Sequence, residues 1–204
     1  MAPLWQAPAP LLLASTSRIR SKLLEDAGIP VEAVAPGVDE RAIETALGEG
    51  VRPAELAARL ARAKAEAVAA CHPDRIVIGA DQVLDLDGEC LGKPASAEEA
   101  RRQMARLAGR SHTLHSAAAI ARNGEPCTVV SATARLVVRD LDDAAIARYV
   151  DLAGAAALRS AGGYEIEGVG IHLLDSVEGE HSTILGLPLL PVLATFRGMK
   201  LLAL

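Results

Sequence analysis

The feature that most restricts the fold of this 204-residue chain is the apolar run Arg-Ile-Val-Ile-Gly-Ala at 75–80. After its first residue, the run shows no alternation of polar and apolar side chains. A strand with this pattern is buried on both faces, and such strands belong to sheets that helices cover on both sides. The run therefore predicts an α/β fold with residues 75–80 in a central strand.

The segments on either side extend this prediction. Apolar periodicity and capping residues predict helices over 18–27, 53–70, 96–109 and 142–150, and a last helix from near Pro188. Further strands are predicted over 11–14, 31–35, 113–121, 128–139 and 169–174, with Asn123-Gly124 as a hairpin turn. This order predicts a partly antiparallel sheet. We expect one domain over residues 11–204, after a loose, proline-rich leader at 1–10.

Composition excludes several classes of partner. The net charge is −5 and the chain has no Lys/Arg tract, whereas a surface for duplex nucleic acid needs clustered positive charge. Aromatic residues make up 2% of the chain, which is too few for base-stacking platforms. No apolar stretch approaches the roughly 20 residues that span a bilayer, and residues 1–10 lack a signal-peptide pattern. We therefore expect a cytoplasmic protein with neither nucleic-acid nor membrane partners.

Hydroxyl and basic residues form the first group of site candidates. The turn Ser15-Thr16-Ser17 lies between a predicted strand and a predicted helix, where free N–H groups and the positive helix end attract phosphate. Arg20 adds a guanidinium for phosphate oxygens. Lys64, within a helix, and Lys93, in a Gly-Lys-Pro sequence, offer further positive charge. The plainer alternatives are helix capping by Ser17 and two solvent-exposed lysines.

Acidic residues form the second group. Asp81 directly follows the buried run, at the strand end where α/β folds build ligand crevices. It suits a metal ligand or a general base for water, and the alternative is an ordinary turn aspartate. Asp39 and Glu40 are placed to share a metal with Asp81, and carboxylate oxygens favour Mg²⁺ or Mn²⁺ over zinc. The histidines lack ligand spacing, so we expect structural or surface roles for them.

Eight short motifs, in collinear order, give these candidates a family context. Together they resemble the Maf family, and the resemblance runs from about residue 11 to residue 190, nearly the whole chain. The motifs are LASTSRIRSKLL (13–24), VDE (38–40), ARAKA (61–65), IGADQV (78–83), GKP (92–94), LAGRSH (107–112), GGYEIEG (162–168) and GLPL (186–189).

The resemblance implies a fold, an activity and a set of site residues. Maf proteins are similar to the inosine-triphosphate pyrophosphatase superfamily, which implies an elongated mixed-sheet α/β body with two lobes around a central cleft. The implied activity is hydrolysis of the α–β phosphoanhydride of a nucleoside triphosphate with a divalent cation, and a homodimer is the implied assembly. Asp81 is the implied catalytic base, with Glu40 beside it at the metal. The positions implied to hold the triphosphate are Ser15, Arg20, Lys64 and Lys93.

Three departures from the commonest family pattern bear on the base. Ile19, Gln82 and Glu167 occupy positions that line the base pocket in the family. An apolar residue, Gln and Glu at these points resemble the 7-methyl-GTP pyrophosphatase subfamily. A carboxylate at 167 suits this base, because it accepts from guanine N1–H and the exocyclic amine, whereas thymine and uracil have one ring N–H donor. The alternatives are a dTTP- and UTP-preferring or broad house-cleaning pyrophosphatase, and a non-catalytic nucleotide-binding regulator of septum formation.

Overall fold

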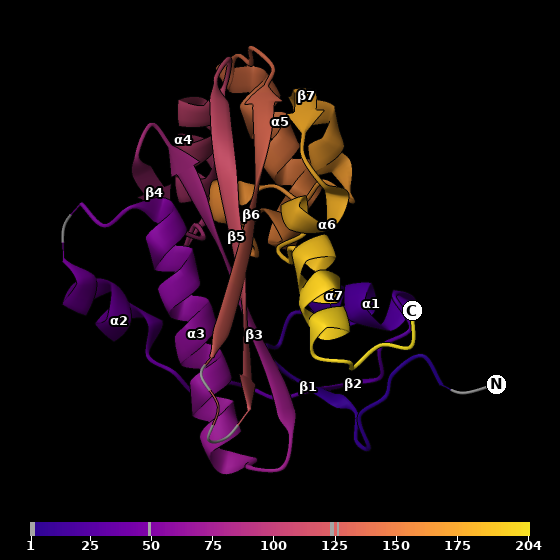
Figure 1. Ribbon diagram of the computed structural model, residues 1–204. Helices are drawn as coiled ribbons and strands as arrows, with labels where there is room; N and C mark the ends of the chain where they lie inside the picture. Colours follow the sequence, from indigo (N-terminus) through magenta and orange to yellow (C-terminus); the bar gives the residue numbers. More distant parts are fainter. Residues whose placement is uncertain (1–2, 49, 123–124, 126) are drawn as a thin grey trace. The chain divides into compact units, whose positions relative to one another are not determined.

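The computed structural model describes residues 3–48, 50–122, 125 and 127–204 (Figure 1). The chain divides into two compact units. Unit 1 comprises Met1–Gln82, Ser116–Ala132 and His181–Leu204, and unit 2 comprises Val83–His115 and Thr133–Glu180. Each unit is built from several stretches of chain, so the prediction of one domain over 11–204 stays a prediction.

The strands of the described residues form one mixed sheet of seven. Their order is β2-β1-β3-β5-β6-β7, and β4 also pairs with β3. Both neighbours of β1 run parallel to it, whereas β4 is antiparallel to β3 and β7 is antiparallel to β6. The strands are β1 (Leu11–Ala14), β2 (Val31–Ala33), β3 (Ile76–Leu86), β4 (Glu89–Leu91), β5 (Ser111–Arg122), β6 (Thr128–Val138) and β7 (Leu174–Glu178). The predicted α/β class with a partly antiparallel sheet is confirmed.

The four long helices predicted from periodicity are also confirmed, as is the last helix after Pro188. Capping explains two of their starts: Ser96 Oγ accepts from Glu99 N at 3.2 Å, and Asp142 Oδ1 accepts from Ala145 N at 2.7 Å. Within the described part of the chain, none of the helices has the length and apolarity needed to cross a bilayer. The helices are α1 (Arg18–Asp26), α2 (Glu40–Leu47), α3 (Pro53–Cys71), α4 (Ala97–Leu107), α5 (Asp143–Ala153), α6 (His181–Ile184) and α7 (Leu189–Gly198), with 3₁₀ turns η1 (Gly154–Leu158), η2 (Ala161–Gly163) and η3 (Val169–Leu173).

Two sequence-based expectations are wrong, and a third concerns residues that the structure does not describe. Asp81 does not end its strand, because β3 continues to Leu86, where its last residues pair with β4. The strand predicted over 169–174 is wrong: residues 169–173 form η3, and β7 begins at Leu174. Glycines at 168 and 170 break the extended pattern there. The predicted turn at Asn123-Gly124 lies outside the described residues.

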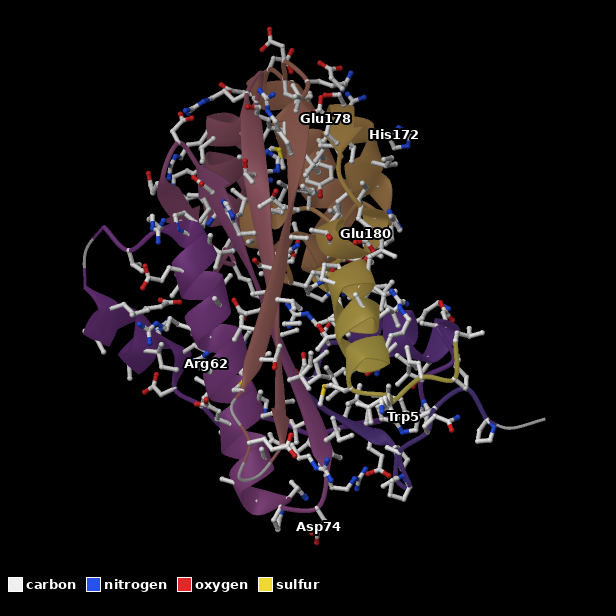
Figure 2. The ribbon with its side chains drawn as sticks, in the orientation of Figure 1. Trp5, Arg62, Asp74, His172, Glu178 and Glu180 are labelled. Atoms are coloured by element: carbon white, nitrogen blue, oxygen red, sulfur yellow. The ribbon has the colours of Figure 1, made fainter. Side chains whose placement is uncertain are left out.

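The expected loose leader is also corrected over its described part, residues 3–10. Trp5 is only 5% exposed, and its ring packs edge-on against Phe196 of α7 with 5.5 Å between centroids. Its indole N–H donates to Ala9 O at 2.8 Å, and residue 5 forms a β-bridge with Leu202. Figure 2 labels Trp5 beside the end of α7. Burial of the Trp5 ring therefore fixes this segment to α7, although its prolines had predicted a loose leader.

Helices cover both faces of the unit 1 sheet (Figure 1). On one face, Ile76, Ile78 and Ala80 of β3 join an apolar cluster with Leu24 of α1 and Phe196 of α7. On the other face, α3 approaches β3 so closely that a Cβ on Gly79 would lie 2.3 Å from Ala61 O and 2.6 Å from Ala65 N. Small residues at these three positions therefore set the distance between α3 and β3.

We predict that Gly79→Ala lowers the free energy of unfolding by about 2–4 kcal/mol, because the added methyl group meets backbone rather than a side chain that can move. Denaturant unfolding followed by circular dichroism measures this. The matched control is Gly198→Ala at the end of α7, where a Cβ meets no atom within 4 Å and the change should stay within about 1 kcal/mol. Equal stabilities of the two variants would contradict the proposed close approach.

Candidate active site

The centre of the site is a buried ion pair between α3 and β3. Lys64 Nζ lies 2.6 Å from Asp81 Oδ1, and the two residues are 6% and 7% exposed. Lys64 Nζ also lies 2.9 Å from Glu40 Oε1, at the start of α2. Lys64 directly precedes Ala65 and Asp81 follows Gly79 by two residues, so the close α3–β3 packing brings the ammonium to the carboxylate. The prediction of a surface lysine, the alternative for Lys64, is wrong.

A guanidinium from α1 belongs to the same site. Arg20 Nη1 donates to Ala80 O at 2.7 Å and lies 3.5 Å from Ser15 Oγ, while Arg20 Nε donates to Gly186 O at 2.9 Å. Ser15 is buried and its Oγ accepts from Ser17 N at 3.2 Å. Ser17 caps α1, as the plainer reading of this turn expected. The structure thus brings Ser15, Arg20, Lys64 and Asp81 together, with Glu40 at the edge.

Burial and the two cations have opposite effects on the Asp81 carboxyl. Removal from water disfavours the charged form and raises the pKa of Asp81, whereas the charges of Lys64 and Arg20 oppose this rise. Burial also lowers the pKa of Arg20, and the charges of Asp81 and Glu40 act against that effect. Asp81 is therefore a carboxylate with increased proton affinity, held among positive groups. Such a group suits a general base.

The remaining predicted residues divide between the units. Ile19, on α1, is half-buried in unit 1. Gln82 is also in unit 1, and its amide nitrogen donates to other groups of that unit: Ser116 Oγ at 2.9 Å, Thr183 O at 2.9 Å and Ile184 O at 3.0 Å. Lys93 and Glu167 belong to unit 2, and both are exposed there. Their predicted roles, like those of the unit 1 residues, stay predictions.

The glycine-rich segment of unit 2 is held by hydrogen bonds from side chains of β5 and α5. Tyr164 is buried, and its hydroxyl lies 2.6 Å from His112 Nε2 of β5. Tyr149 of α5 donates its hydroxyl proton to Gly163 O at 3.0 Å. Burial lowers the pKa of His112 to about 4, so this imidazole is neutral at physiological pH. The expected structural role of His112 fits these contacts.

The acidic residues of the site meet the needs of a hard divalent cation in part. Within residues 3–48, 50–122, 125 and 127–204, no group of three or more His, Cys, Asp or Glu side chains is placed to hold a metal. Asp81 and Glu40 both pair with the Lys64 ammonium, which contacts one oxygen of each carboxylate. Mg²⁺ commonly takes only one or two carboxylates and completes its shell with water and substrate phosphates. The donor set therefore fits such an ion.

Sequence reasoning missed the residues that support the site from the other face of β3. Ser116 and Thr183 are fully buried, and Ser116 Oγ donates to Thr183 O at 2.7 Å. Ser116 precedes five apolar residues in β5, and a polar residue at the edge of such a run was the available signal. Gly186 stood in a family-like motif, but only the structure shows that its carbonyl accepts from Arg20.

The chain is similar to known proteins over almost its whole length. The model of the family described as Maf-like protein matches residues 10–199. A nucleoside triphosphate pyrophosphatase of Rhodopseudomonas palustris strain HaA2 is 50% identical over 200 residues, which cover 98% of each chain. A 7-methyl-GTP pyrophosphatase of Brucella abortus biovar 1 strain 9-941 is 44% identical over 191 residues, covering 93% of this chain and 96% of that one. Among solved structures, the Staphylococcus aureus Ham1 protein matches with a TM-score of 0.44 and 19% identity, over 65% of this chain and 73% of that one.

We predict that Asp81 makes the stability of this chain depend on pH. A folded-state pKa above the unfolded value means that the folded protein holds the proton more tightly, so stability falls as pH rises from about 4 through the raised pKa. Asp81→Asn removes this titration. The difference in unfolding free energy, variant minus wild type, should therefore grow with pH by about 1.4 kcal/mol per unit of pKa shift. Denaturant titrations at several pH values measure it, with Asp74→Asn, an exposed change before β3 (Figure 2), as the control. A difference that shrinks with pH would contradict the raised pKa.

Proposed function

Because this chain belongs to the Maf family, we propose that it hydrolyses a nucleoside triphosphate to its monophosphate and pyrophosphate. The observation that carries the proposal is the buried Asp81 carboxylate, 2.6 Å from Lys64 Nζ and near the Arg20 guanidinium. A base of increased proton affinity and a set of fixed cations are the two requirements of this reaction.

In the proposed reaction, Asp81 accepts a proton from water while the water oxygen bonds to the α-phosphorus. The bond from that phosphorus to the bridging oxygen breaks, and the electron pair leaves with pyrophosphate. Negative charge grows on the departing group, so positive groups held in place stabilise the transition state more than the substrate. Lys64 retains a third ammonium N–H beyond those directed at Asp81 and Glu40, and among the hydrogen bonds described above Arg20 uses Nε and Nη1, which leaves the N–H groups of Nη2.

Phosphate binding is assigned to the start of α1 and to the basic residues. Ser15 and the first N–H groups of α1 lie beside Arg20, and this end of the helix carries partial positive charge. Lys93, exposed in unit 2, is proposed as a further phosphate ligand by its place in the Gly-Lys-Pro motif. We propose that Asp81 and Glu40 hold a divalent cation, Mg²⁺ or Mn²⁺. When bound, such an ion neutralises phosphate charge and lowers the pKa of water.

The finer proposal concerns the base. The Brucella abortus relative, 44% identical, is a 7-methyl-GTP pyrophosphatase, and this chain has a carboxylate at Glu167. A carboxylate complements both the N–H donors of guanine and the positive charge of its 7-methylated form. The Rhodopseudomonas palustris relative at 50% identity has a name that specifies no base. We therefore propose 7-methyl-GTP as the preferred substrate, with a dTTP- and UTP-preferring enzyme as the competing assignment.

Asp81→Asn distinguishes the enzyme from a nucleotide-binding regulator. We predict that it reduces pyrophosphate release at least about 10³-fold and keeps nucleotide affinity within about tenfold, because the base is lost while the phosphate ligands remain. A coupled pyrophosphate assay with Mg²⁺ or Mn²⁺ and calorimetric titration measure the two quantities. If wild-type protein releases no pyrophosphate from any nucleotide of a broad panel, the proposed enzymatic activity is refuted.

The base assignment predicts a ratio of kcat/KM values. We expect kcat/KM for 7-methyl-GTP to exceed that for dTTP, UTP and inosine triphosphate, and Glu167→Gln to reduce this preference about tenfold through loss of a charged acceptor. The matched control is Glu178→Gln, an exposed change in the same unit (Figure 2), which should leave the ratio unaltered. A preference for dTTP or UTP would contradict the 7-methyl-GTP assignment. An unaltered ratio of kcat/KM values in Glu167→Gln would show that this residue does not recognise the base.

A further inference from the structure

Three carbonyl groups at and just after the end of α6, those of Thr183, Ile184 and Gly186, accept hydrogen bonds from side chains of other elements. Gln82 Nε2, on β3, donates to Thr183 O and Ile184 O at 2.9 and 3.0 Å. Ser116 Oγ, on β5, donates to Thr183 O at 2.7 Å and accepts from Gln82 Nε2 at 2.9 Å. Arg20 Nε, on α1, donates to Gly186 O at 2.9 Å. Residues 183–186, called the 183–186 brace below, therefore connect three separate elements.

Gly186 is the residue that lets this segment meet Arg20. Its φ is +93°, a left-handed conformation that side chains with a Cβ rarely adopt. A Cβ placed on it would lie 3.2 Å from both Arg20 Nε and Nη2. The glycine thus gives the segment both its turn and its close approach to the guanidinium. The Arg20 side chain is then fixed at two points, by Gly186 O and by Ala80 O.

The two connections reach β3 on either side of Asp81. Ala80, whose carbonyl accepts from Arg20, directly precedes Asp81, and Gln82, whose amide donates to the brace, directly follows it. Side chains alternate across a strand, so Asp81 faces Lys64 on α3 while Gln82 points to the opposite face. The same short segment therefore holds the backbone before and after the carboxylate.

We propose that the 183–186 brace, with Gln82 and Ser116, positions Asp81 and Arg20 for the reaction. The catalytic part of this proposal rests on the proposed function, and the brace itself rests on the contacts alone. Gln82 is accordingly a positioning residue, held through its amide nitrogen. Its two amide protons face three acceptors within 3.0 Å, so they are engaged inside unit 1.

Ser116→Ala tests the brace without touching substrate, because Ser116 is fully buried. The change removes a donor to Thr183 O and an acceptor for Gln82, so Asp81 and Arg20 lose part of their positional restraint. We expect kcat to fall about tenfold with KM within about twofold, since small misplacements of reacting groups reduce rate more than binding.

Two comparisons separate positioning from a general loss of stability. Thr195→Val removes another hydroxyl-to-carbonyl hydrogen bond of unit 1, from Thr195 Oγ1 to Pro191 O in α7, and should leave kcat and KM unchanged. Gln82→Leu should reproduce the effect of Ser116→Ala, and the double variant should be no worse than either, as for members of one network. Additive losses, or a Gln82→Leu effect confined to base preference, would overturn the positioning role.

Hydrogen–deuterium exchange provides a readout independent of activity. We expect Ser116→Ala to increase exchange in peptides spanning 78–84 and 181–187, and Thr195→Val to leave both unchanged. Equal exchange in the two variants overturns the brace, whatever the enzyme assay gives. Wild-type protein that releases no pyrophosphate overturns the proposed function instead, and the exchange comparison then still decides whether the brace exists.

Discussion

The ion pair between Lys64 and Asp81 depends on how closely α3 packs on β3. Gly79 leaves no room for a side chain between its own Cα and the backbone of Ala61 and Ala65, so helix and strand lie at the shortest practicable distance. At that distance a lysine one residue before Ala65 reaches a carboxylate two residues after Gly79 with 2.6 Å between Nζ and Oδ1. The position of the two charges in the core therefore follows from three small residues, none of which is itself charged.

Removing the Lys64–Asp81 pair from water costs free energy, and the attraction of the neighbouring charges offsets this desolvation only in part. Desolvation raises the pKa of Asp81 in spite of two neighbouring cations, which shows that burial outweighs their attraction. A protein selected for stability alone would place an apolar pair here. Retention of a carboxylate with raised pKa, beside an arginine whose own pKa burial lowers, is more readily explained by a need for proton transfer near fixed positive charge.

Sequence patterns predicted what depends on local order and on apolar periodicity. The unbroken run at 75–80 gave the central strand, and Ser96 and Asp142 marked the starts of α4 and α5. Long-range contacts were not predictable in this way. The extension of β3 beyond Asp81 depends on pairing with β4, and the anchoring of Trp5 depends on Phe196, far along the chain. For the site, motif order grouped Arg20, Lys64 and Asp81. The polar residue Ser116 stood out in its strand, but its contacts, like those of the carbonyls near Gly186, depend on segments far apart in the chain.

The division of the chain also places the proposed base and most of the proposed phosphate ligands in a different unit from Glu167, the residue proposed to recognise guanine. Ser15, Arg20, Glu40, Lys64 and Asp81 are all in unit 1, whereas Glu167 is in unit 2, on a segment that His112 and Tyr149 hold through Tyr164 and Gly163. Gln82 and Ile19, the two other residues predicted to line the base pocket, are in unit 1, and the 183–186 brace gives Gln82 a role there as well. Substitutions around Glu167 can then alter the preference for one nucleotide base over another without disturbing the ion pair between Lys64 and Asp81. Changes near Asp81, by contrast, alter the base-independent step of water activation and pyrophosphate departure.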